Sequence, residues 1–300
     1  MSEDKAMYEL NQAGFCSYYI NCPAKIGIYV KDNRDAYLID SGNDKDAGKK
    51  VLKILGEQGW SLKGIINTHS HADHIGGNSY LQKQTGCRVF SGGIEKAFTE
   101  YPVLEPSFLY GGYPHGGLRH KFLLASQSEA VDFSHPDFPK ELEIIPLYGH
   151  SFDMVGIKTP DGTFFAADSV SSDTTLEKYR ISFIYDVAKY LETLDMLEEM
   201  SCSLFVPSHA APCDSISALC QLNRSVVYEI ADKIKELLKE AMCFEKLLCK
   251  LFDIYGLTMT AEQYVLVGST VRSYLSWLSD KGEISFEISD SMMLWKSLLP

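Results

Sequence analysis

Features that would direct the chain to a membrane or to nucleic acid are missing from the sequence. No apolar run approaches the roughly eighteen residues that a membrane-spanning helix needs. The first residues, MSEDKAMYELNQAGF, are acidic and contain no apolar signal-peptide core, so we expect neither membrane insertion nor secretion. Positive charge is scarce: 28 Lys and Arg stand against 40 Asp and Glu, which gives a formal net charge of −12. We therefore expect no nucleic-acid partner, since binding to phosphates depends on lysine and arginine.

Regular cysteine spacing is missing too. The eight cysteines show neither a CxxC pair nor the even spacing of a disulfide framework. The simplest interpretation is a cytoplasmic protein with reduced thiols, several of them filling the core. The remaining composition, 45% hydrophobic and 23% charged, is typical of a globular protein with one large domain or two ordinary ones.

Short apolar segments alternate with amphipathic segments through the first two thirds of the chain. This alternation predicts an α/β fold whose sheets are covered by helices. Helices are expected over 46–59 and 187–200, among other places. The predicted strands are IGIYV, AYLID, GIINT, RVFSG, LEIIPLYG, VGIKT, TFFAAD and SLFVPSH.

Residues 95–142 interrupt this alternation. The stretch is rich in glycine, proline and aromatic residues, and it is too long for an ordinary connection inside a compact domain. We expect an active-site loop or cap. The alternative is a surface excursion that packs on itself.

The last third of the chain is helical in character. Apolar positions at helical spacing predict helices over 215–242 and 243–256 and a helix pair across 260–282, before the strand-like tail GEISFEI. Helices followed by a hairpin are typical of a winged helix. We predict a catalytic domain at 1–214 and a winged-helix-like domain at 215–300. The second contains nine Lys and Arg against eleven Asp and Glu, which favours packing or a homodimer over DNA binding.

The segment THSHADHIGG, residues 68–77, concentrates metal-binding residue types. His69 and His71 are two apart, so their imidazoles face one side while the chain stays extended after GIINT. A helix beginning near Asp73 would project Asp73 and His74 beside that pair, where they could hold a second ion. Histidine nitrogen with carboxylate oxygen suits zinc, with iron and manganese as competitors. Surface polar residues near a helix start are the alternative, which four ligand types in six positions disfavour.

Three other residues of metal-binding types lie at or just after the ends of predicted strands. His150 follows LEIIPLYG, Asp168 ends TFFAAD and His209 ends SLFVPSH. A site for two ions needs ligands from separate strands, and these residue types bind metals. Asp40, which ends AYLID, is either a hydrogen-bond partner that supports the ligands or a turn residue before Ser41.

In order and approximate spacing, THSHADHIGG, GHSFDMVGI, FFAADSV and VPSHAAP resemble the successive motifs of the metallo-β-lactamase superfamily. The resemblance covers about residues 15–215 and implies a four-layer αβ/βα sandwich with the site at one edge between two sheets. Asp40 then matches an aspartate that supports the ligands. The implied ligands are His69, His71 and His150 for one ion, Asp73, His74 and His209 for the second, and Asp168 as a bridge between them.

The chain departs from parts of that superfamily. After His150 it carries SFD where many relatives have a Thr-Pro-Gly-like turn, so Phe152 could face the substrate. Asp168 is not a cysteine, and the ligand set therefore resembles the hydrolase branch rather than the best-known antibiotic-cleaving lactamases. His71 is not a glutamate, which separates the chain from the di-iron flavoprotein reductases of this fold.

Two divalent ions about 3.5–4 Å apart can lower the pKa of a water between them and present it as hydroxide. We therefore predict a dinuclear hydrolase of small-molecule esters, thioesters or lactones, resembling glyoxalase II-like thioesterases and lactonases. Asp73 could orient the nucleophile or pass a proton to the leaving group. One alternative is a metal-dependent nuclease or phosphodiesterase acting on RNA, since RNA-trimming members carry winged-helix-like extensions. Another is a mononuclear iron enzyme that oxidises a thiol or persulfide.

Candidate substrate contacts come from two aromatic segments. In RISFIYDVAKY, Phe183 and Tyr185 could close the pocket, although packing of the sheet is the favoured interpretation. For the residues of 95–142, exposed polar side chains on a loop are the alternative. The candidates are Tyr110, Tyr113, His115, His120 and Lys121 at the pocket mouth, with Phe152 and Tyr185 nearer the ligands.

Overall fold

The computed structural model describes residues 7–298. Its strands are β1 (Glu9–Gln12), β2 (Ser17–Asn21), β3 (Ile26–Val30), β4 (Asp35–Ile39), β5 (Ser61–Ile66), β6 (Arg88–Phe90), β7 (Glu143–Pro146), β8 (Val155–Lys158), β9 (Thr163–Ser171), β10 (Leu204–His209), β11 (Met242–Cys243), β12 (Ile284–Ser289) and β13 (Met292–Ser297). Its helices are α1 (Lys45–Gln58), α2 (Ala72–Ile75), α3 (Asn78–Thr85), α4 (Gly93–Glu100), α5 (Leu104–Tyr110), the 3-10 turn η2 (Gly116–Leu118), α6 (Asp173–Tyr179), α7 (Val187–Glu199), α8 (Ser217–Leu237), α9 (Phe244–Tyr255) and α10 (Ala261–Asp280).

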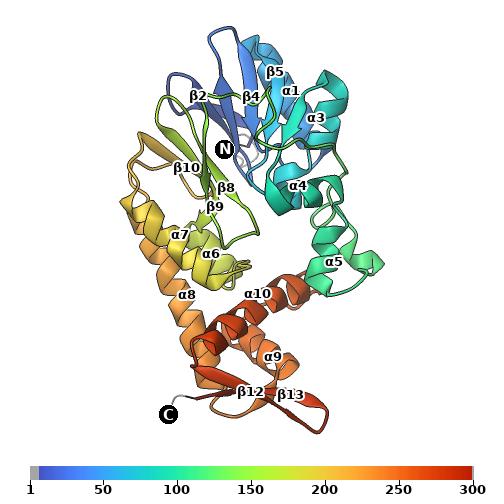
Figure 1. Ribbon diagram of the computed structural model, residues 1–300, viewed down its shortest axis with the longest axis vertical. Coiled ribbons are helices and arrows are strands. Elements are labelled where there is room, and N and C mark those ends of the chain that lie inside the picture. The colour runs from blue at the N-terminus through green and yellow to red at the C-terminus, as the bar shows by residue number, and fades with distance from the viewer. Residues whose placement is uncertain (1–6, 299–300) are drawn as a thin grey trace.

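Two large sheets lie face to face in the upper part of Figure 1. Within the described residues, one sheet has the strand order β1-β2-β3-β4-β5-β6 and the other β10-β9-β8-β7. Helices α1 and α3 pack on the first sheet, while α7 and α8 pack on the second through β9 and each other. The layers therefore run helix, sheet, sheet, helix, which confirms the predicted four-layer α/β sandwich.

Strand β3 shows how the sequence builds these layers. Ile26 and Ile28 are buried in the cluster that α1 covers, whereas Tyr29 belongs to the cluster between the two sheets. This division follows from the alternation of side chains along a strand. Gly27 lies against Phe165 of the other sheet, where an added Cβ would stand 2.6 Å from the ring. Glycine therefore lets the sheets approach closely at this point.

The predicted strands of the sandwich are all present, as β3 to β10. The pattern did not predict β1 or β2, which are half-buried strands at one edge of the first sheet. The prediction of a helix pair across 260–282 is wrong, because α10 is one continuous helix. Gly268 does not break it, since Val267 and Val271 on either side are buried in the core, and packing outweighs the low helix propensity of glycine.

Residues 95–142 have more structure than a loop. They include most of α4, all of α5 and η2, and a bridge between Val131 and Phe90 at the edge of the first sheet. Helix α5 lies beside α10 at the lower right of Figure 1. A role of 95–142 as an active-site cap stays a prediction.

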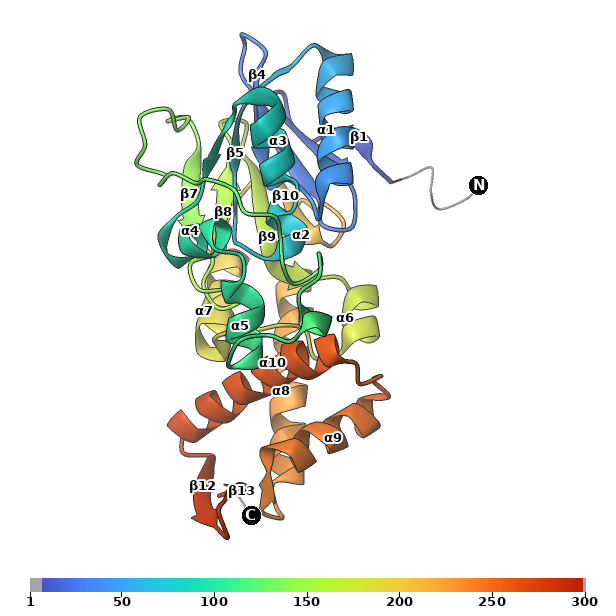
Figure 2. The same cartoon turned by 90° about the vertical axis from the view of Figure 1, so that its right-hand side faces the viewer.

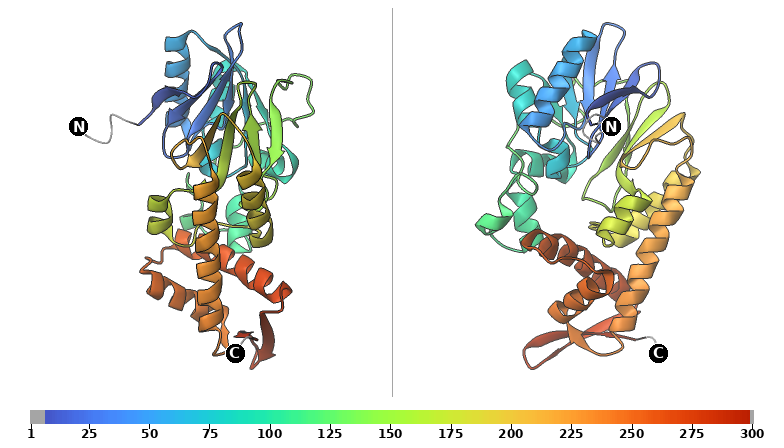
Figure 3. Two further views of the ribbon diagram at one scale, coloured as in Figure 1. Left: turned by 90° about the vertical axis from the view of Figure 1, so that its left-hand side faces the viewer. Right: turned by 180° about the vertical axis from the view of Figure 1, so that it is seen from behind.

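The C-terminal segment lies below the sandwich in Figure 1 and packs against the rest of the chain through α8 and α10. Helix α8 descends from the second sheet, and α10 crosses beneath both sheets (Figures 1 and 2). From behind, α8 is seen to connect the two parts of the molecule (Figure 3). Helices α9 and α10 are followed by the hairpin β12-β13, which β11 extends. The winged-helix assignment and the division at residue 214 stay predictions.

Two expectations from composition bear on the described residues. All eight cysteines lie within residues 7–298, and each of them is free there. In the same part of the chain, no helix has both the length and the apolar character that a membrane span requires.

Candidate metal centre

The side chains singled out as metal ligands lie together at one edge of the two sheets. The loop after β5 carries His69 and His71, and the short helix α2 begins directly after His71 and carries Asp73 and His74. The remaining ligand candidates come from the second sheet or the loop after β7: His150, Asp168 and His209. Each of three sets has ligand atoms within 4.8 Å of one another, namely His69, His71 and His150; His69, His74 and Asp168; and Asp73, His74 and His209.

Three imidazole nitrogens form the first group. His71 Nδ1 lies 3.1 Å from His69 Nε2 and 3.1 Å from His150 Nε2. His69 is fully buried, and His150 is 9% exposed. The nitrogens thus converge on one point, as the ligands of a single ion must.

Asp168 connects this group to the second one. Its Oδ1 lies 3.1 Å from His74 Nε2, while its Oδ2 lies 3.1 Å from His209 Nε2 and 3.6 Å from His150 Nε2. Asp73 Oδ2 completes the second group at 3.8 Å from His74 Nε2 and 3.7 Å from His209 Nε2. Asp168 therefore stands where a ligand shared by two ions would stand.

Asp168 does not end its strand, contrary to the prediction from TFFAAD. Strand β9 continues to Ser171, and its register with β10 shifts on both sides of Pro207. Ala167 has a φ of 48°, in the left-handed region that residues with a side chain rarely adopt. A bulge at this point redirects the next side chain, so Asp168 turns toward the site from within a strand.

The nitrogens that face away from the site are held by hydrogen bonds. Asp40 Oδ2 lies 2.8 Å from His74 Nδ1 and accepts from Thr68 Oγ1 at 2.7 Å, and Thr68 Oγ1 lies 3.0 Å from His69 Nδ1. His150 Nδ1 lies 3.1 Å from the carbonyl oxygen of Phe183. Partners of this kind fix the ring orientation and leave the inner nitrogen free to bind a metal. Asp40 is 2% exposed, so its carboxylate depends on these contacts.

Burial and nearby charges shift the pKa values of the five histidines in two opposite directions. Burial lowers the pKa of His71 to about 4 and that of His150 to about 3, and it lowers the pKa of His69 well below its usual value. Burial also opposes protonation of His74 and His209, but the neighbouring carboxylates together outweigh it and raise both pKa values. Asp168 and Asp73 act on both rings, and Asp40 adds to them at His74. The first group therefore offers uncharged nitrogens with free lone pairs, and the second combines imidazole with carboxylate.

This arrangement fits a divalent ion better than it fits hydrogen bonding alone. His74 Nε2 and Asp168 Oδ1 are buried and have no hydrogen-bond partner of acceptable geometry, although they are 3.1 Å apart. Buried polar atoms left in this way call for a missing partner. Imidazole nitrogen with carboxylate oxygen is a donor set that zinc accepts, and iron and manganese bind it too.

Sequence reasoning missed Glu95, which ties the two histidine loops together. Its carboxylate accepts from Ser70 N at 2.9 Å and from Ser70 Oγ, and from Asp153 N at 3.0 Å and Ser151 Oγ. Ser70 lies between His69 and His71, and Ser151 follows His150. Glu95 is 1% exposed at the first turn of α4. No local pattern marks it, because its partners are distant in sequence.

A cavity of about 270 Å³ opens beside the ligands. Phe183 lines it, with its ring 5.1 Å from that of His71 and 5.7 Å from that of His150. Phe183 also packs against a buried cluster formed by Leu109, Leu118, Leu123 and Val265. Both interpretations from sequence therefore hold in part, although this cluster lies outside the sheets. Phe152 and Tyr185 stack at 4.2 Å and line a narrow hollow that His71 also borders. The structure thus brings these two candidates to the edge of the site.

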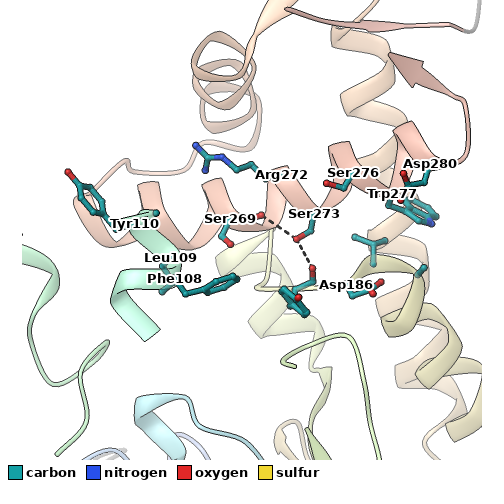
Figure 4. A pocket seen from close by; sticks show the side chains of 14 residues that line it. Phe108, Leu109, Tyr110, Asp186, Ser269, Arg272, Ser273, Ser276, Trp277 and Asp280 are labelled. Atoms are coloured by element: carbon teal, nitrogen blue, oxygen red, sulfur yellow. Dashed lines mark hydrogen bonds between the residues drawn. The ribbon is translucent and has the colours of Figure 1, made fainter. Parts of the chain in front are cut away.

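The other substrate candidates lie away from the cavity that the ligands line. Tyr110 borders a separate cavity between α5 and α10 (Figure 4). Tyr113 is 73% exposed, and the His115 ring accepts from Gly117 N. His120 pairs with Glu262 at 2.7 Å, and Lys121 pairs with Asp44 at 2.9 Å. None of these residues lines the cavity beside the ligands in the described structure.

Comparisons with known proteins agree with this fold. A family model described as the Metallo-beta-lactamase superfamily matches residues 26–209. A hydroxyacylglutathione hydrolase of Rhodopseudomonas palustris (strain BisB18) is 43% identical over 67 residues, 20% of this chain and 26% of that protein. A metallo-beta-lactamase type 2 of Pseudomonas aeruginosa is 38% identical over 61 residues, 20% of this chain and 25% of that protein. The chain thus matches only about a quarter of these relatives' length.

Solved structures extend the likeness over nearly the whole chain. A beta-lactamase domain protein from Burkholderia ambifaria has a TM-score of 0.74 and 17% identity, covering 97% of this chain and 94% of that one. A metallo-beta-lactamase family protein from Thermus thermophilus has a TM-score of 0.68 and 14% identity, covering 97% of each chain. At these identities the likeness shows the fold, and it includes the C-terminal segment.

Proposed function

The chain belongs to the metallo-β-lactamase superfamily, and from that premise we propose that it is a hydrolase dependent on two divalent metal ions. Zinc is the expected ion, with iron and manganese as competitors. The observation that carries the proposal is the position of Asp168 between two groups of ligand atoms. His69, His71 and His150 would hold one ion, Asp73, His74 and His209 the other, and Asp168 both.

The proposed substrates are small-molecule thioesters, esters or lactones. Support comes from the names of the relatives, which include hydroxyacylglutathione hydrolases, and from the cavity beside the ligands. That cavity measures about 270 Å³, and no lysine or arginine among the described residues lines it. An RNA substrate would need basic side chains along its phosphates, so the cavity favours a small molecule.

The residues around the site have separable roles in this proposal. Divalent ions held by the ligand candidates would supply a Lewis acid for the scissile carbonyl and a water of lowered pKa. Asp73 is the ligand candidate most open to the cavity, with its side chain 42% exposed, and it can carry a proton to the leaving group. Phe183 excludes water from one side of His71, while Asp40 and Glu95 hold the ligand loops in place.

The test is turnover by the purified full chain after zinc loading. We expect hydrolysis within a panel of thioesters, esters and lactones, its loss with a chelator and its return with zinc. Metal analysis should find about two ions per chain, and His69→Ala should lose both metal and activity. His135→Ala is the matched control, because His135 lies outside the ligand groups.

Other results would overturn the proposal. A protein that holds two zinc ions and hydrolyses nothing in the panel is not this kind of hydrolase. One iron per chain with oxygen consumption would favour the thiol or persulfide oxygenase. Retention of single-stranded RNA at low salt would favour the nuclease.

We also propose a cytoplasmic location and a homodimer formed through the C-terminal segment. Apolar side chains exposed on the hairpin β12-β13 support the homodimer, including Phe286 at 52% and Ile288 at 66% exposure. Such side chains on an edge strand favour association. Sedimentation equilibrium should give a dimer that Ile288→Lys converts to a monomer. A wild-type monomer at micromolar concentration would exclude this interface.

A further inference from the structure

Helix α10 supplies one wall of the cavity beside the metal ligands. Gln263, Leu266 and Val267, from its first turns, line that cavity together with the ligand candidates. Figure 1 shows α10 crossing beneath the two sheets, so a segment more than fifty residues after the last ligand motif reaches the site. The C-terminal segment therefore takes part in shaping the space that a substrate enters.

Helix α10 and the His150 ring both form hydrogen bonds to the same short segment, residues 183–185. Ser273 Oγ of α10 donates to the carbonyl oxygen of Tyr185 at 2.7 Å. Two residues earlier, the carbonyl oxygen of Phe183 meets His150 Nδ1 at 3.1 Å. Both the ligand and the helix are thus anchored to one short stretch of backbone, and the distance between them is defined.

The cavity offers little to a charged group. Its charged residues are the ligand candidates themselves, and no lysine or arginine lines it within the described residues. A carboxylate or phosphate placed on the α10 side would lose water and meet no lysine or arginine, so only the proposed metal ions could compensate for its charge. An adjoining cavity of about 520 Å³, which shares Asp73 and His209, carries Lys178. A cation is therefore available on that side of the site and not beside α10.

The cavity is small, and apart from the ligand candidates its walls carry no charge. Leu266 and Val267 of α10 line it together with Ile181 and Phe183. The other lining residues outside the ligand groups are uncharged and polar, namely Ser171, Thr175, Tyr179, Ser182 and Gln263. At about 270 Å³ the whole cavity is smaller than most pockets that hold a complete ligand, which measure roughly 300–1,000 Å³. It therefore suits one part of a substrate, and its four apolar residues favour an uncharged, apolar group there.

We propose that this cavity binds the acyl group of the substrate, that the acyl group is uncharged and apolar, and that α10 sets this preference. The proposal rests on the hydrolase function proposed above and adds the substrate class. It assigns α10 to specificity, because Gln263, Leu266 and Val267 line the cavity and none of them belongs to a ligand group.

The test compares two thioesters of N-acetylcysteamine that share a leaving group and differ in charge, butanoyl and succinyl. With zinc-loaded full chain, we expect kcat/KM for butanoyl to exceed that for succinyl by about 100-fold. Gln263→Arg places a cation in the cavity and should reduce this ratio at least about tenfold, through faster succinyl turnover. Ser276→Arg is the matched control, because it adds the same charge to α10 in the separate cavity of Figure 4.

A second measurement does not depend on turnover. The methyl groups of Leu266 and Val267 are followed by NMR while non-hydrolysable ketone analogues of the two thioesters are added. We expect the butanoyl analogue to shift these methyl resonances and the succinyl analogue to leave them in place. The resonances also show whether each variant is folded.

The outcomes separate this inference from the proposed function. Hydrolysis with equal or greater preference for succinyl overturns the inference and leaves the hydrolase proposal standing. Absence of turnover with methyl shifts from the butanoyl analogue overturns thioester hydrolysis and supports the apolar subsite. Absence of both turnover and shifts overturns both.

Discussion

At the scale of single residues, the candidate site depends on side chains that contact the ligand candidates from outside the ligand groups. Thr68 Oγ1 lies 3.0 Å from His69 Nδ1 and 2.7 Å from Asp40 Oδ2, so one hydroxyl links a histidine to a buried carboxylate. Asp40 follows β4 directly, with a φ of 64° in the left-handed region. The hydrogen bonds to Thr68 and His74 support its interpretation as a partner of the ligand candidates.

Asp40→Asn tests whether that carboxylate supports metal binding. The amide keeps the size of the side chain but loses the charge that stabilises the His74 ring, so zinc affinity should fall about 10–100-fold. Competition with a chromophoric chelator measures this loss. Asp46→Asn is the control, since the Asp46 side chain is 73% exposed. Unchanged affinity in Asp40→Asn would contradict a role of this carboxylate in metal binding.

Metal binding should release protons, because two ligand candidates hold them in the metal-free protein. The raised pKa values of His74 and His209 keep their imidazoles protonated to higher pH than usual, and an ion must displace those protons. Apparent zinc affinity should therefore rise with pH through this range. His71 and His150, with pKa values of about 4 and about 3, add nothing to it near neutrality.

Calorimetry measures this release directly. Zinc titrations at about pH 6 in buffers of different ionisation enthalpy should give about one to two protons per chain. Affinity that is flat from about pH 6 to about pH 8, with no proton released, would contradict the protonation of His74 and His209.

At the scale of elements, α4 acts as a clamp on the two histidine loops. Glu95 holds Ser70 and Ser151, and in return Ile94 N donates to Asp153 Oδ2 at 2.8 Å. Residues 94 and 95 at the start of α4 and Asp153 in the loop after His150 are therefore joined by hydrogen bonds in both directions. The positions of His71 and His150 relative to each other therefore depend on this one helix start.

Glu95→Gln should weaken that clamp. The Glu95 carboxylate accepts hydrogen bonds from Ser70, Ser151 and Asp153, and the amide nitrogen of glutamine cannot accept them. This loss should lower the free energy of unfolding by about 1.5–3 kcal/mol. Zinc affinity, measured well below the unfolding temperature, should also fall, which a purely structural role would not require. Glu57→Gln, an exposed change on α1, is the control. Wild-type affinity in a destabilised Glu95→Gln would limit Glu95 to stability.

Elements whose signal is local could be predicted from the sequence, and those that depend on distant contacts could not. The alternation in IGIYV and the apolar run of TFFAAD are visible in the residues themselves. The bulge at Ala167 depends on pairing with Pro207, and the half-buried strands β1 and β2 depend on their neighbours. The helix pair predicted across 260–282 is one helix, and Gly268 within it lies close to Leu248 and Phe244 of α9, a distant contact that the sequence does not show.

At the scale of the whole molecule, α8 belongs to both the sandwich and the C-terminal segment. Near its start, Asn223 Oδ1 accepts from Ser171 N at 3.0 Å and Asn223 Nδ2 donates to Ser171 O at 2.9 Å, which joins α8 to β9. Its later turns pack against α9 and β13. A boundary at residue 214 would therefore remove the helix that covers part of the second sheet.

A chain that ends at residue 214 should consequently fail to fold as an independent domain. Without α8, Val170 and Phe205 of the second sheet lose part of their cover, because they share one buried cluster with Cys220 and Val227. We expect binding of the dye ANS, a weak near-ultraviolet circular dichroism spectrum and no cooperative thermal transition. A chain ending at residue 240, which retains α8, should bind less dye and regain part of the spectrum. Cooperative unfolding of the shorter chain would instead establish residues 1–214 as a domain.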